Sequence, residues 1–165
     1  MAGPRVRAAT VADTGPIVSL VRALARYEKA EHAVEMTEDA LRAALFGPQP
    51  KVFALVADEA GAVVGMAVYF FSFSTWTGRH GLYLEDLFVL PEHRRHGAGR
   101  ALVAALAARA VAAGCARLEW AVLDWNQPAI DFYGSLGAVA MDEWTTFRLS
   151  GASLARLAEE GAPSS

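Results

Sequence analysis

The sequence predicts an α/β domain in which helices flank a mixed, mostly antiparallel central sheet of about six to seven strands. Strand-like apolar segments follow one another between residues 51 and 90, and their connections are too short for crossovers, so they pair antiparallel. A helical pattern over residues 97–113 then leads to a further strand at 117–123, which such a crossover makes parallel. The chain has 165 residues, 54% of them hydrophobic, so we expect residues 1–165 to form one domain with its own core.

The N-terminal part is expected to hold one strand and two helices. The strand covers residues 5–9. The first helix follows Thr10, whose sequence context resembles a capping box, and ends near residues 27–29. The second helix is capped by Thr37 and ends before Gly47. Apolar residues at helical spacing support both helices: Ile17, Leu20, Val21 and Leu24 in the first, Leu41 and Leu45 in the second.

The strand expected at residues 82–90 carries two adjacent acids, Glu85 and Asp86, in an otherwise apolar segment. A buried acid lowers the stability of the fold unless it is paired, so an unpaired one indicates a function. Neighbouring side chains on a regular strand point to opposite faces, so both acids reach one pocket only if the strand is irregular. We therefore predict a bulge or splay near residues 85–88. The alternative for either acid is a structural bond at the sheet surface.

The motif Arg94-Arg95-His96-Gly97-Ala98-Gly99 follows this strand and opens the helix. Its glycines permit a tight turn and let an anion approach the free N–H groups of the first helical turn. The helix dipole and the two arginines favour a negative group there, so the motif predicts a diphosphate cradle. A dinucleotide-binding turn would have a third glycine where Leu102 stands, and a P-loop would have Gly-Lys-Ser/Thr, so neither of these classes is indicated.

The C-terminal part is expected to contain two short helices and a hairpin. The helices cover residues 129–136 and 152–159. Residues 138–149 are extended and predicted to fold as a tight hairpin around Asp142 and Glu143. The tail over residues 161–165 is expected to fray.

Composition narrows the function classes. The net charge of −3 argues against a nucleic-acid partner, because such proteins normally carry a basic excess. We expect no membrane span, because no apolar run approaches the ~20 residues required, and the first residues lack the apolar stretch of a signal peptide. Cys115 is the single cysteine, which suits a reducing compartment and gives a cytoplasmic expectation. The four histidines show no metal-ligand spacing, so we expect no metal.

The pattern Arg-x-x-Gly-x-Gly directly after an acid-bearing strand resembles the acetyl-CoA-binding motif of the GNAT N-acetyltransferases, and the expected order of elements resembles the GNAT fold over nearly the whole chain. Within that family the chain resembles the diamine acetyltransferases, the spermidine/spermine and thialysine type, and is closer to the thialysine branch. The segments that carry this resemblance are Ala25-Arg26-Tyr27-Glu28-Lys29, Phe46-Gly47, Ser74 to Arg79, Tyr83-Leu84-Glu85-Asp86, Arg94 to Gly99, Ala121 to Asn126, and Phe132-Tyr133 followed by Gly137.

The resemblance implies an acetyl-CoA-dependent N-acetyltransferase and assigns its catalytic residues. Glu85 is the candidate base, acting through a water, and Asp86 holds the ammonium beside it. The hydroxyl of Tyr133 protonates or hydrogen-bonds the coenzyme A thiolate; otherwise Tyr133 is a core tyrosine. Direct attack in a ternary complex is expected, because no cysteine lies near the predicted site.

Cofactor-binding positions also follow from the resemblance. The backbone of Leu87 to Val89 pairs with the pantetheine arm like an added strand. Asn126 bonds the same arm or caps the following helix, and the two roles can coexist. The complete predicted set is Leu87, Phe88, Val89, Arg94, Arg95, His96, Gly97, Ala98, Gly99, Arg100, Asn126 and Tyr133.

For the acceptor amine we single out Tyr27, Glu28, Ser74, Thr75 and Trp76. Glu28 pairs with a distal ammonium and the aromatic rings offer faces to a cation, unless Glu28 is simply solvated and the aromatics pack. The polyamine enzymes carry an acid where Ser74 stands, so its absence favours a shorter amine over spermidine.

The resulting hypothesis is an acetyltransferase of a small primary amine that forms a homodimer, as the diamine acetyltransferases do. The alternatives are a protein or peptide N-acetyltransferase, an antibiotic-modifying enzyme, and a non-catalytic acyl-CoA-binding regulatory module.

Overall fold

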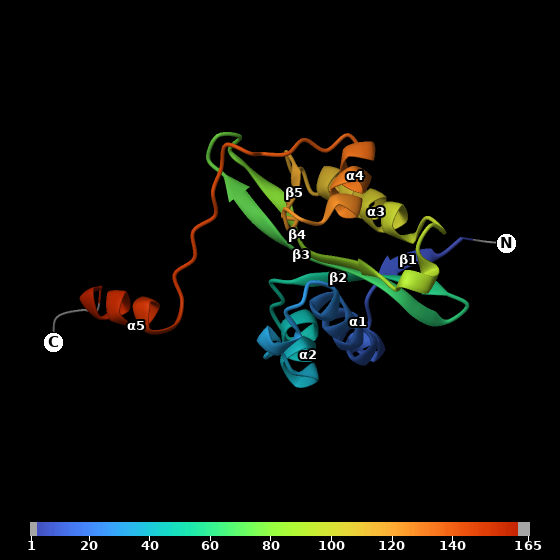
Figure 1. Cartoon of the computed structure of the whole chain (residues 1–165), viewed down its shortest axis with the longest axis horizontal. Coiled ribbons are helices and arrows are strands. Elements are labelled where there is room, and N and C mark those ends of the chain that lie inside the picture. The colour runs from blue at the N-terminus through green and yellow to red at the C-terminus, as the bar shows by residue number, and fades with distance from the viewer. Residues whose placement is uncertain (1–2, 162–165) are drawn as a thin grey trace. The chain divides into compact units, whose positions relative to one another are not determined.

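The computed structural model of this chain describes residues 3–161, so most of the tail that we expected to fray lies outside the described residues. The chain divides into two compact units between Ala121 and Val122. In the first unit five strands form one sheet in sequence order (Figure 1). They are β1 (Arg5–Ala8), β2 (Phe53–Glu59), β3 (Ala62–Ser74), β4 (Arg79–Val89) and β5 (Leu118–Trp120).

The strand pairing confirms the predicted mixed sheet. β1, β2, β3 and β4 pair antiparallel in succession, whereas β5 pairs parallel to β4. The crossover between β4 and β5 is α3 (Ala98–Ala112), as the helical pattern indicated.

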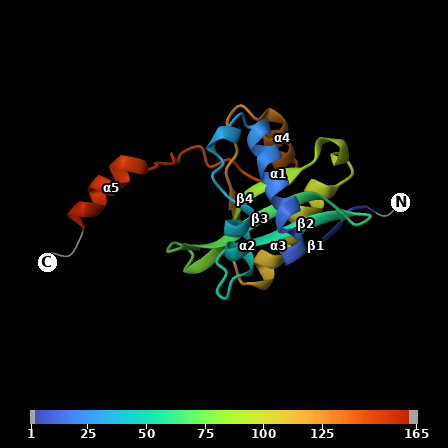
Figure 2. The same cartoon turned by 90° about the horizontal axis from the view of Figure 1, so that it is seen from below.

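Two further helices, α1 (Thr14–Tyr27) and α2 (Glu38–Phe46), cover one face of the sheet, and α3 covers the other (Figures 1 and 2). Thr37 caps α2, its side-chain oxygen accepting a hydrogen bond from the Ala40 amide at 3.1 Å. Three single-turn 3-10 helices lie in the connections: η1 (Val11–Asp13), η2 (Glu31–Ala33) and η3 (Pro91–His93).

Each face of the sheet packs its own hydrophobic core. On the α3 face, Leu102 and Leu106 pack against strand residues such as Leu82 and Leu84. On the other face the buried cluster joins the two N-terminal helices to the middle strands; its members include Ile17, Leu20, Leu41, Leu45, Val56, Met66, Val68 and Phe88. The central part of the sheet is therefore buried on both sides, and polar side chains within that part need a specific explanation.

The second unit contains α4 (Gln127–Ser135) and α5 (Gly151–Glu160). Residues 138–150 between them form no strand, so the predicted hairpin over 138–149 is wrong. A turn does form, since the Trp144 amide bonds the Met141 carbonyl at 3.2 Å, but its arms do not pair. The sequence around Asp142 lacks the Asn-Gly or Asp-Gly dipeptide that favours two-residue hairpins, and an isolated two-stranded hairpin is at best marginally stable in water.

The strand count is also lower than expected, five among the described residues instead of six to seven. Besides the missing hairpin, the strand predicted at 117–123 is shortened to β5, Leu118–Trp120. Its pairing stops at Leu84 of β4, where the register of β4 becomes irregular.

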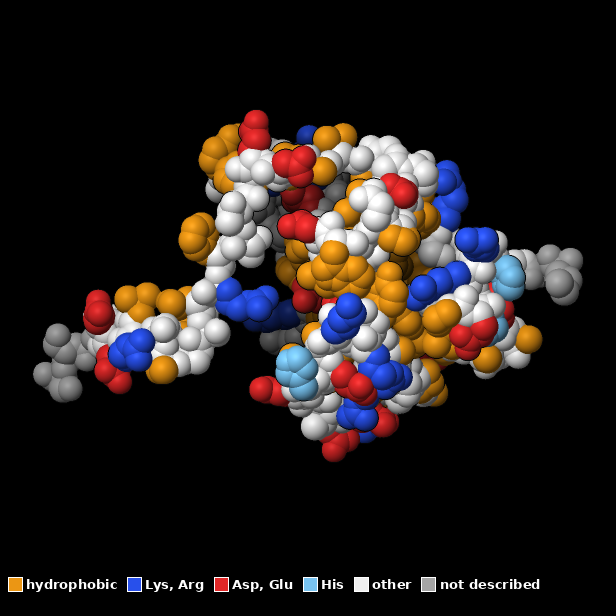
Figure 3. Space-filling model, in the orientation of Figure 1, with side chains coloured by type: hydrophobic (Ala, Val, Ile, Leu, Met, Phe, Trp, Pro, Cys, Tyr) orange, Lys and Arg blue, Asp and Glu red, His pale blue; other side chains and the backbone are white. Residues whose placement is uncertain are grey.

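Acidic and basic side chains are interspersed over α1 and α2 on the face drawn in Figure 3, as the nearly balanced composition suggests. No helix within residues 3–161 is both long enough and apolar enough to cross a membrane.

Candidate active site

The register of β4 shifts at Glu85. Leu84 lies opposite Tyr69 of β3 and Asp86 lies opposite Val68, so Glu85 is the extra residue of a β-bulge. This confirms the bulge predicted near residues 85–88.

The bulge changes the face on which the following side chains emerge. Leu84 belongs to the core on the α3 face, and regular alternation would put Asp86 there as well. Instead Asp86 is paired with Val68, which packs in the core under α1 and α2. Directly opposed residues share a face, so Asp86 emerges on the α1 side of the sheet.

Asp86 lies close enough to Glu85 and Glu28 for their charges to act on it. Burial, and to a lesser extent the negative charges of Glu85 and Glu28, together raise the pKa of Asp86 to about 6. Glu28 caps the C-terminal end of α1, and its own pKa is raised by burial. Glu85 is exposed, whereas Asp86 and Glu28 are half-buried. A negatively charged cluster of this kind suits a positively charged ligand.

The edge of β4 beyond the bulge is open in the first unit. β5 pairs with β4 only at residues 82–84, while β3 continues along the other edge to Val89. Among the residues of this unit, no strand pairs with the outer edge of Leu87 to Val89. Their main-chain groups on that side can therefore accept an added extended segment.

The glycine turn places the helix N-terminus next to this open edge. Gly97 has φ +86° and Arg95 has φ +67°, so the chain reverses sharply before α3 begins at Ala98. A Cβ on Gly97 would meet nothing within 4 Å, so the backbone here is open to an approaching group. The N–H groups of the first turn, from Gly97 to Arg100, have no intrahelical acceptor.

Arg94 connects the turn to β4 and α1. Its Nε donates a hydrogen bond to the Val89 carbonyl at 2.9 Å. Its guanidinium lies over two rings, 5.4 Å from the centroid of Tyr27 and 5.2 Å from that of Phe88. Tyr27 was predicted to offer its ring to the cationic acceptor amine. In the structure the Arg94 guanidinium already lies over that ring. An exposed, oriented arginine beside a helix N-terminus is a suitable anion partner.

The hairpin residues predicted to contact the acceptor lie elsewhere. Ser74 ends β3 opposite Arg79, and its hydroxyl accepts a hydrogen bond from the Thr77 amide at 3.3 Å. Seven residues of β4 separate this end from Asp86, a distance of roughly 20 Å at the usual rise per residue. Thr75 and Trp76 follow in the turn, where the Trp76 side chain is 91% exposed. The structure thus groups residues 27, 28, 85, 86 and 94 but not residues 74–76.

In the second unit Asn126 and Tyr133 both belong to α4. Asn126 is the N-cap, its Oδ1 accepting from the Ala129 amide at 3.4 Å, so the capping role predicted as one alternative is confirmed. Tyr133 lies in the last turn of α4, with its ring 5.5 Å from that of Phe132.

Two features escaped the sequence analysis. Tyr83 was given no role, yet its pKa is raised by burial and by the charges of Glu85 and Glu119. Its strand position two residues before an acid was the available signal. The other feature is a cluster of Glu59, His93 and His96. The two histidines follow Glu59 by 34 and 37 residues in the sequence.

Comparison with known proteins identifies the class. Residues 17–138 match the model of the acetyltransferase (GNAT) family. The chain therefore belongs to this family, as the turn motif indicated, and is an N-acetyltransferase by descent.

Individual relatives narrow the class. The chain is 40% identical to the thialysine N-epsilon-acetyltransferase of Mus musculus and 43% identical to that of Bos taurus, in both cases over 96% of this chain and 99% of the relative. Among solved structures, an integron cassette protein from the mobile metagenome of V. cholerae superposes with a TM-score of 0.80 at 28% identity, covering 96% of this chain and 99% of that one.

Proposed function

We propose that this chain transfers an acetyl group from acetyl-CoA to the primary amine of a small amine or amino acid, by direct attack in a ternary complex. The carrying observation is the bulge at Glu85, which gathers the carboxylates of Glu28, Glu85 and Asp86 beside the open edge of β4. A cluster of three acids favours an alkyl ammonium, and one of its carboxylates can remove the proton that makes this group unreactive at neutral pH.

Several groups of the chain would suit coenzyme A in this proposal. The N–H groups at the start of α3, together with Arg94, Arg95, His96 and Arg100, would hold the diphosphate. The main chain of Leu87 to Val89 would bond the pantetheine amides along the open edge of β4. Asn126 would contribute a further bond to the same arm while it caps α4.

The proposed reaction balances through two protein groups. Glu85 accepts a proton from the ammonium through a water, and the freed amine nitrogen attacks the thioester carbonyl carbon. The C–N bond forms and the C–S bond breaks. The Tyr133 hydroxyl gives its proton to the departing thiolate, and the second proton of the attacking nitrogen returns to the Tyr133 oxygen. The proton held by Glu85 leaves to solvent. Asp86 and Glu28 hold positive charge on the acceptor.

Thialysine and similar short amino acids are the acceptors we favour. The mouse and cattle relatives are thialysine N-epsilon-acetyltransferases at 40% and 43% identity. Ser74 is neutral where the polyamine enzymes carry an acid, so one counter-ion for a long polycation is lacking. We further propose that the chain acts as a single GNAT domain, works in the cytoplasm and binds neither nucleic acid nor membrane. It needs no metal for acetyl transfer. It forms a homodimer in which Ser74, Thr75 and Trp76 serve the acceptor site.

A test is thiol release from acetyl-CoA with thialysine, lysine, ornithine, short diamines, spermidine, an aminoglycoside and a peptide amine. We expect the highest kcat/KM for thialysine or another short amine, well above spermidine. Spermidine as the best acceptor would overturn the argument from Ser74. A peptide or aminoglycoside as the best acceptor would replace the small-amine proposal, and no release with any amine despite coenzyme A binding would favour a regulatory module.

A further inference from the structure

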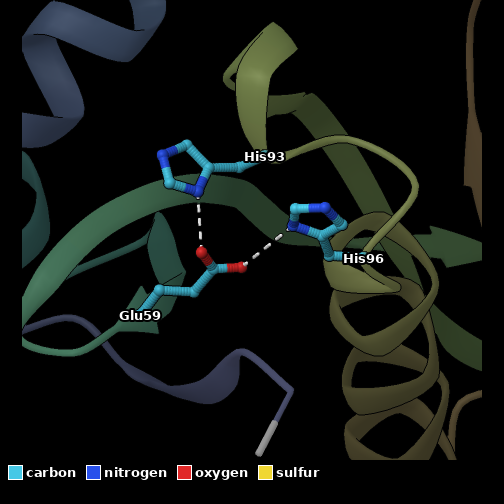
Figure 4. Close-up of side chains that lie close together, drawn as sticks. All are labelled: Glu59, His93 and His96. Carbon is cyan, nitrogen blue, oxygen red and sulfur yellow. Dashed lines mark hydrogen bonds and ion pairs between the residues drawn. The ribbon is translucent and has the colours of Figure 1, made fainter. Parts of the chain in front are cut away.

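A second group of side chains that can ligate a metal lies outside the cluster of Glu28, Glu85 and Asp86. Glu59 ends β2, His93 ends η3, and His96 lies in the turn before α3. His93 Nδ1 is 2.7 Å from Glu59 Oε2, and His96 Nδ1 is 4.0 Å from Glu59 Oε1. Figure 4 shows the two imidazole rings turned toward the same carboxylate, one toward each oxygen.

The three donor atoms have the spacing of a metal-ligand set. They all lie within 4.8 Å of one another, and within residues 3–161 no other group of three His, Cys, Asp or Glu meets this condition. Ligands about 2.0–2.1 Å from a tetrahedral zinc ion stand about 3.4 Å apart. The observed separations of 2.7 and 4.0 Å lie on either side of that value, so small side-chain rotations suffice.

The chemistry of the donors selects the ion. Two imidazoles and one carboxylate suit zinc and its neighbours among the first-row transition metals. Magnesium and calcium prefer sets made of oxygen ligands, so they are excluded as the cognate ions. Glu59 and His93 are half-buried and His96 is exposed, which leaves access for the ion and room for a water or anion at the fourth position.

The backbone also favours a site here. His93 and His96 flank the segment in which Arg95 takes φ +67°, and Gly97 with φ +86° follows directly. A residue other than glycine with positive φ is strained, so the surroundings must hold this turn in place. An ion bound by both histidines would fix the two ends of the turn to β2 through Glu59.

We infer that Glu59, His93 and His96 form a transition-metal site of the Zn²⁺ type, which ties the turn before α3 to the end of β2. Glu59 and His93 lie outside the residues assigned to acetyl transfer, whereas His96 is also among the groups proposed to hold the coenzyme A diphosphate, so Zn²⁺ binding is measured in the absence of coenzyme A. The metal site is tested by measuring bound metal ion and not turnover. The inference of a metal site can therefore fail while the proposed activity holds, and the proposed activity can fail while the metal site holds.

The test is calorimetric titration of ZnCl₂ into the EDTA-treated chain without a histidine tag. One Zn²⁺ per chain is expected, and no heat above dilution with MgCl₂. E59Q, H93N and H96N should each weaken Zn²⁺ binding at least about tenfold, because even outer-shell changes commonly cost that much. The asparagine of H93N keeps an N–H that can donate a hydrogen bond to Glu59. This variant therefore preserves the hydrogen bond to Glu59 while it removes the metal-binding imidazole.

The matched control is H32N, which removes an exposed histidine in η2 and should leave Zn²⁺ affinity unchanged. Hydrogen exchange of the amides from Arg94 to Gly99 should slow when Zn²⁺ is added to the natural chain but not to H93N. Thermal unfolding without metal shows whether each variant is folded. Absence of binding, or equal binding by H93N and H32N, would overturn the site and leave only the ion pair of Glu59 with His93.

Discussion

Adjacent residues Glu85 and Asp86 occupy different environments although both are acids on one strand. Glu85 forms the bulge and is exposed, whereas Asp86 is half-buried on the α1 side opposite Val68. Burial, together with the charges of the neighbouring carboxylates, therefore raises the pKa of Asp86 to about 6. This is the arrangement expected of a group that is kept for function at a cost in stability.

The pH dependence of stability tests this at Asp86. Its folded-state pKa of about 6 lies above the ordinary value of 3.8, so the folded chain binds the proton more tightly. The stability contributed by protonated Asp86 is present below pH 3.8 and is lost as pH rises through about 6. In urea titrations at pH 8, D86N should therefore have a free energy of unfolding about 1–2 kcal/mol higher than the natural chain. The gain is limited to this size because the Asp86 carboxyl keeps some contact with solvent, and it should shrink toward pH 4.

The control for this comparison is D39N, since Asp39 is exposed on α2. It should show no such pH-dependent gain. Equal stability of D86N and the natural chain at pH 8 would mean that Asp86 is not held in an unfavourable place.

At the scale of elements, the turn between β4 and α3 depends on Gly97. Its φ of +86° is a conformation that L side chains rarely adopt, although there is open space around it. G97A should therefore cost about 1 kcal/mol of stability through the backbone alone. It should also raise the Kd for coenzyme A, measured by calorimetry, because the approach to the first N–H groups of α3 is altered.

G134A provides the matched glycine. Gly134 lies inside α4 without positive φ, and an added Cβ would meet nothing within 4 Å. This change should leave stability the same or slightly higher, since alanine is the better helix former. If G97A and G134A behave alike, the turn is not conformationally demanding.

The elements differ in how far their sequence determined them. The bulge was predictable because two adjacent acids on an apolar strand cannot share a face on a regular one. The glycine turn into α3 was predictable because its signal is local: glycines, arginines and a helix start lie within six residues. The arms at 138–149 alternate enough to suggest strands, yet a strand exists only with a partner, and local pattern cannot supply one.

At the scale of the molecule, residues distant in sequence meet in ways that spacing could not reveal. Glu59 joins His93 across 34 residues because β2 ends beside η3. Glu28 influences Asp86 because α1 lies on the face to which the bulge turns that residue. Conversely, Ser74 and Glu85 belong to neighbouring strands, yet the hairpin end is far from the bulge.

That separation leads to a prediction for the proposed homodimer. If the hairpin residues serve the acceptor site of the partner subunit, each site takes Trp76 from one chain and Glu85 from the other. W76A and E85Q then damage the same site through different chains. Mixing the two inactive variants under exchange should restore about one quarter of the natural sites, because half of the dimers are mixed and each has one intact site. Steady-state turnover after mixing measures this.

The control is a mixture of E85Q with D86N, whose defects lie on the same strand of each chain. It should recover nothing. Lack of recovery with W76A as well, or full activity of W76A alone, would contradict a site completed by the hairpin.

The central claim is that the bulged strand supplies the proton acceptor for an amine, and E85Q tests it most directly. In steady-state assays with thialysine and acetyl-CoA, kcat should fall by about 10²-fold or more, while the Kd for coenzyme A stays unchanged. E92Q, at an exposed acid in η3, should keep its activity. A value of kcat for E85Q equal to that of E92Q would contradict the account, because Glu85 would then not accept the proton.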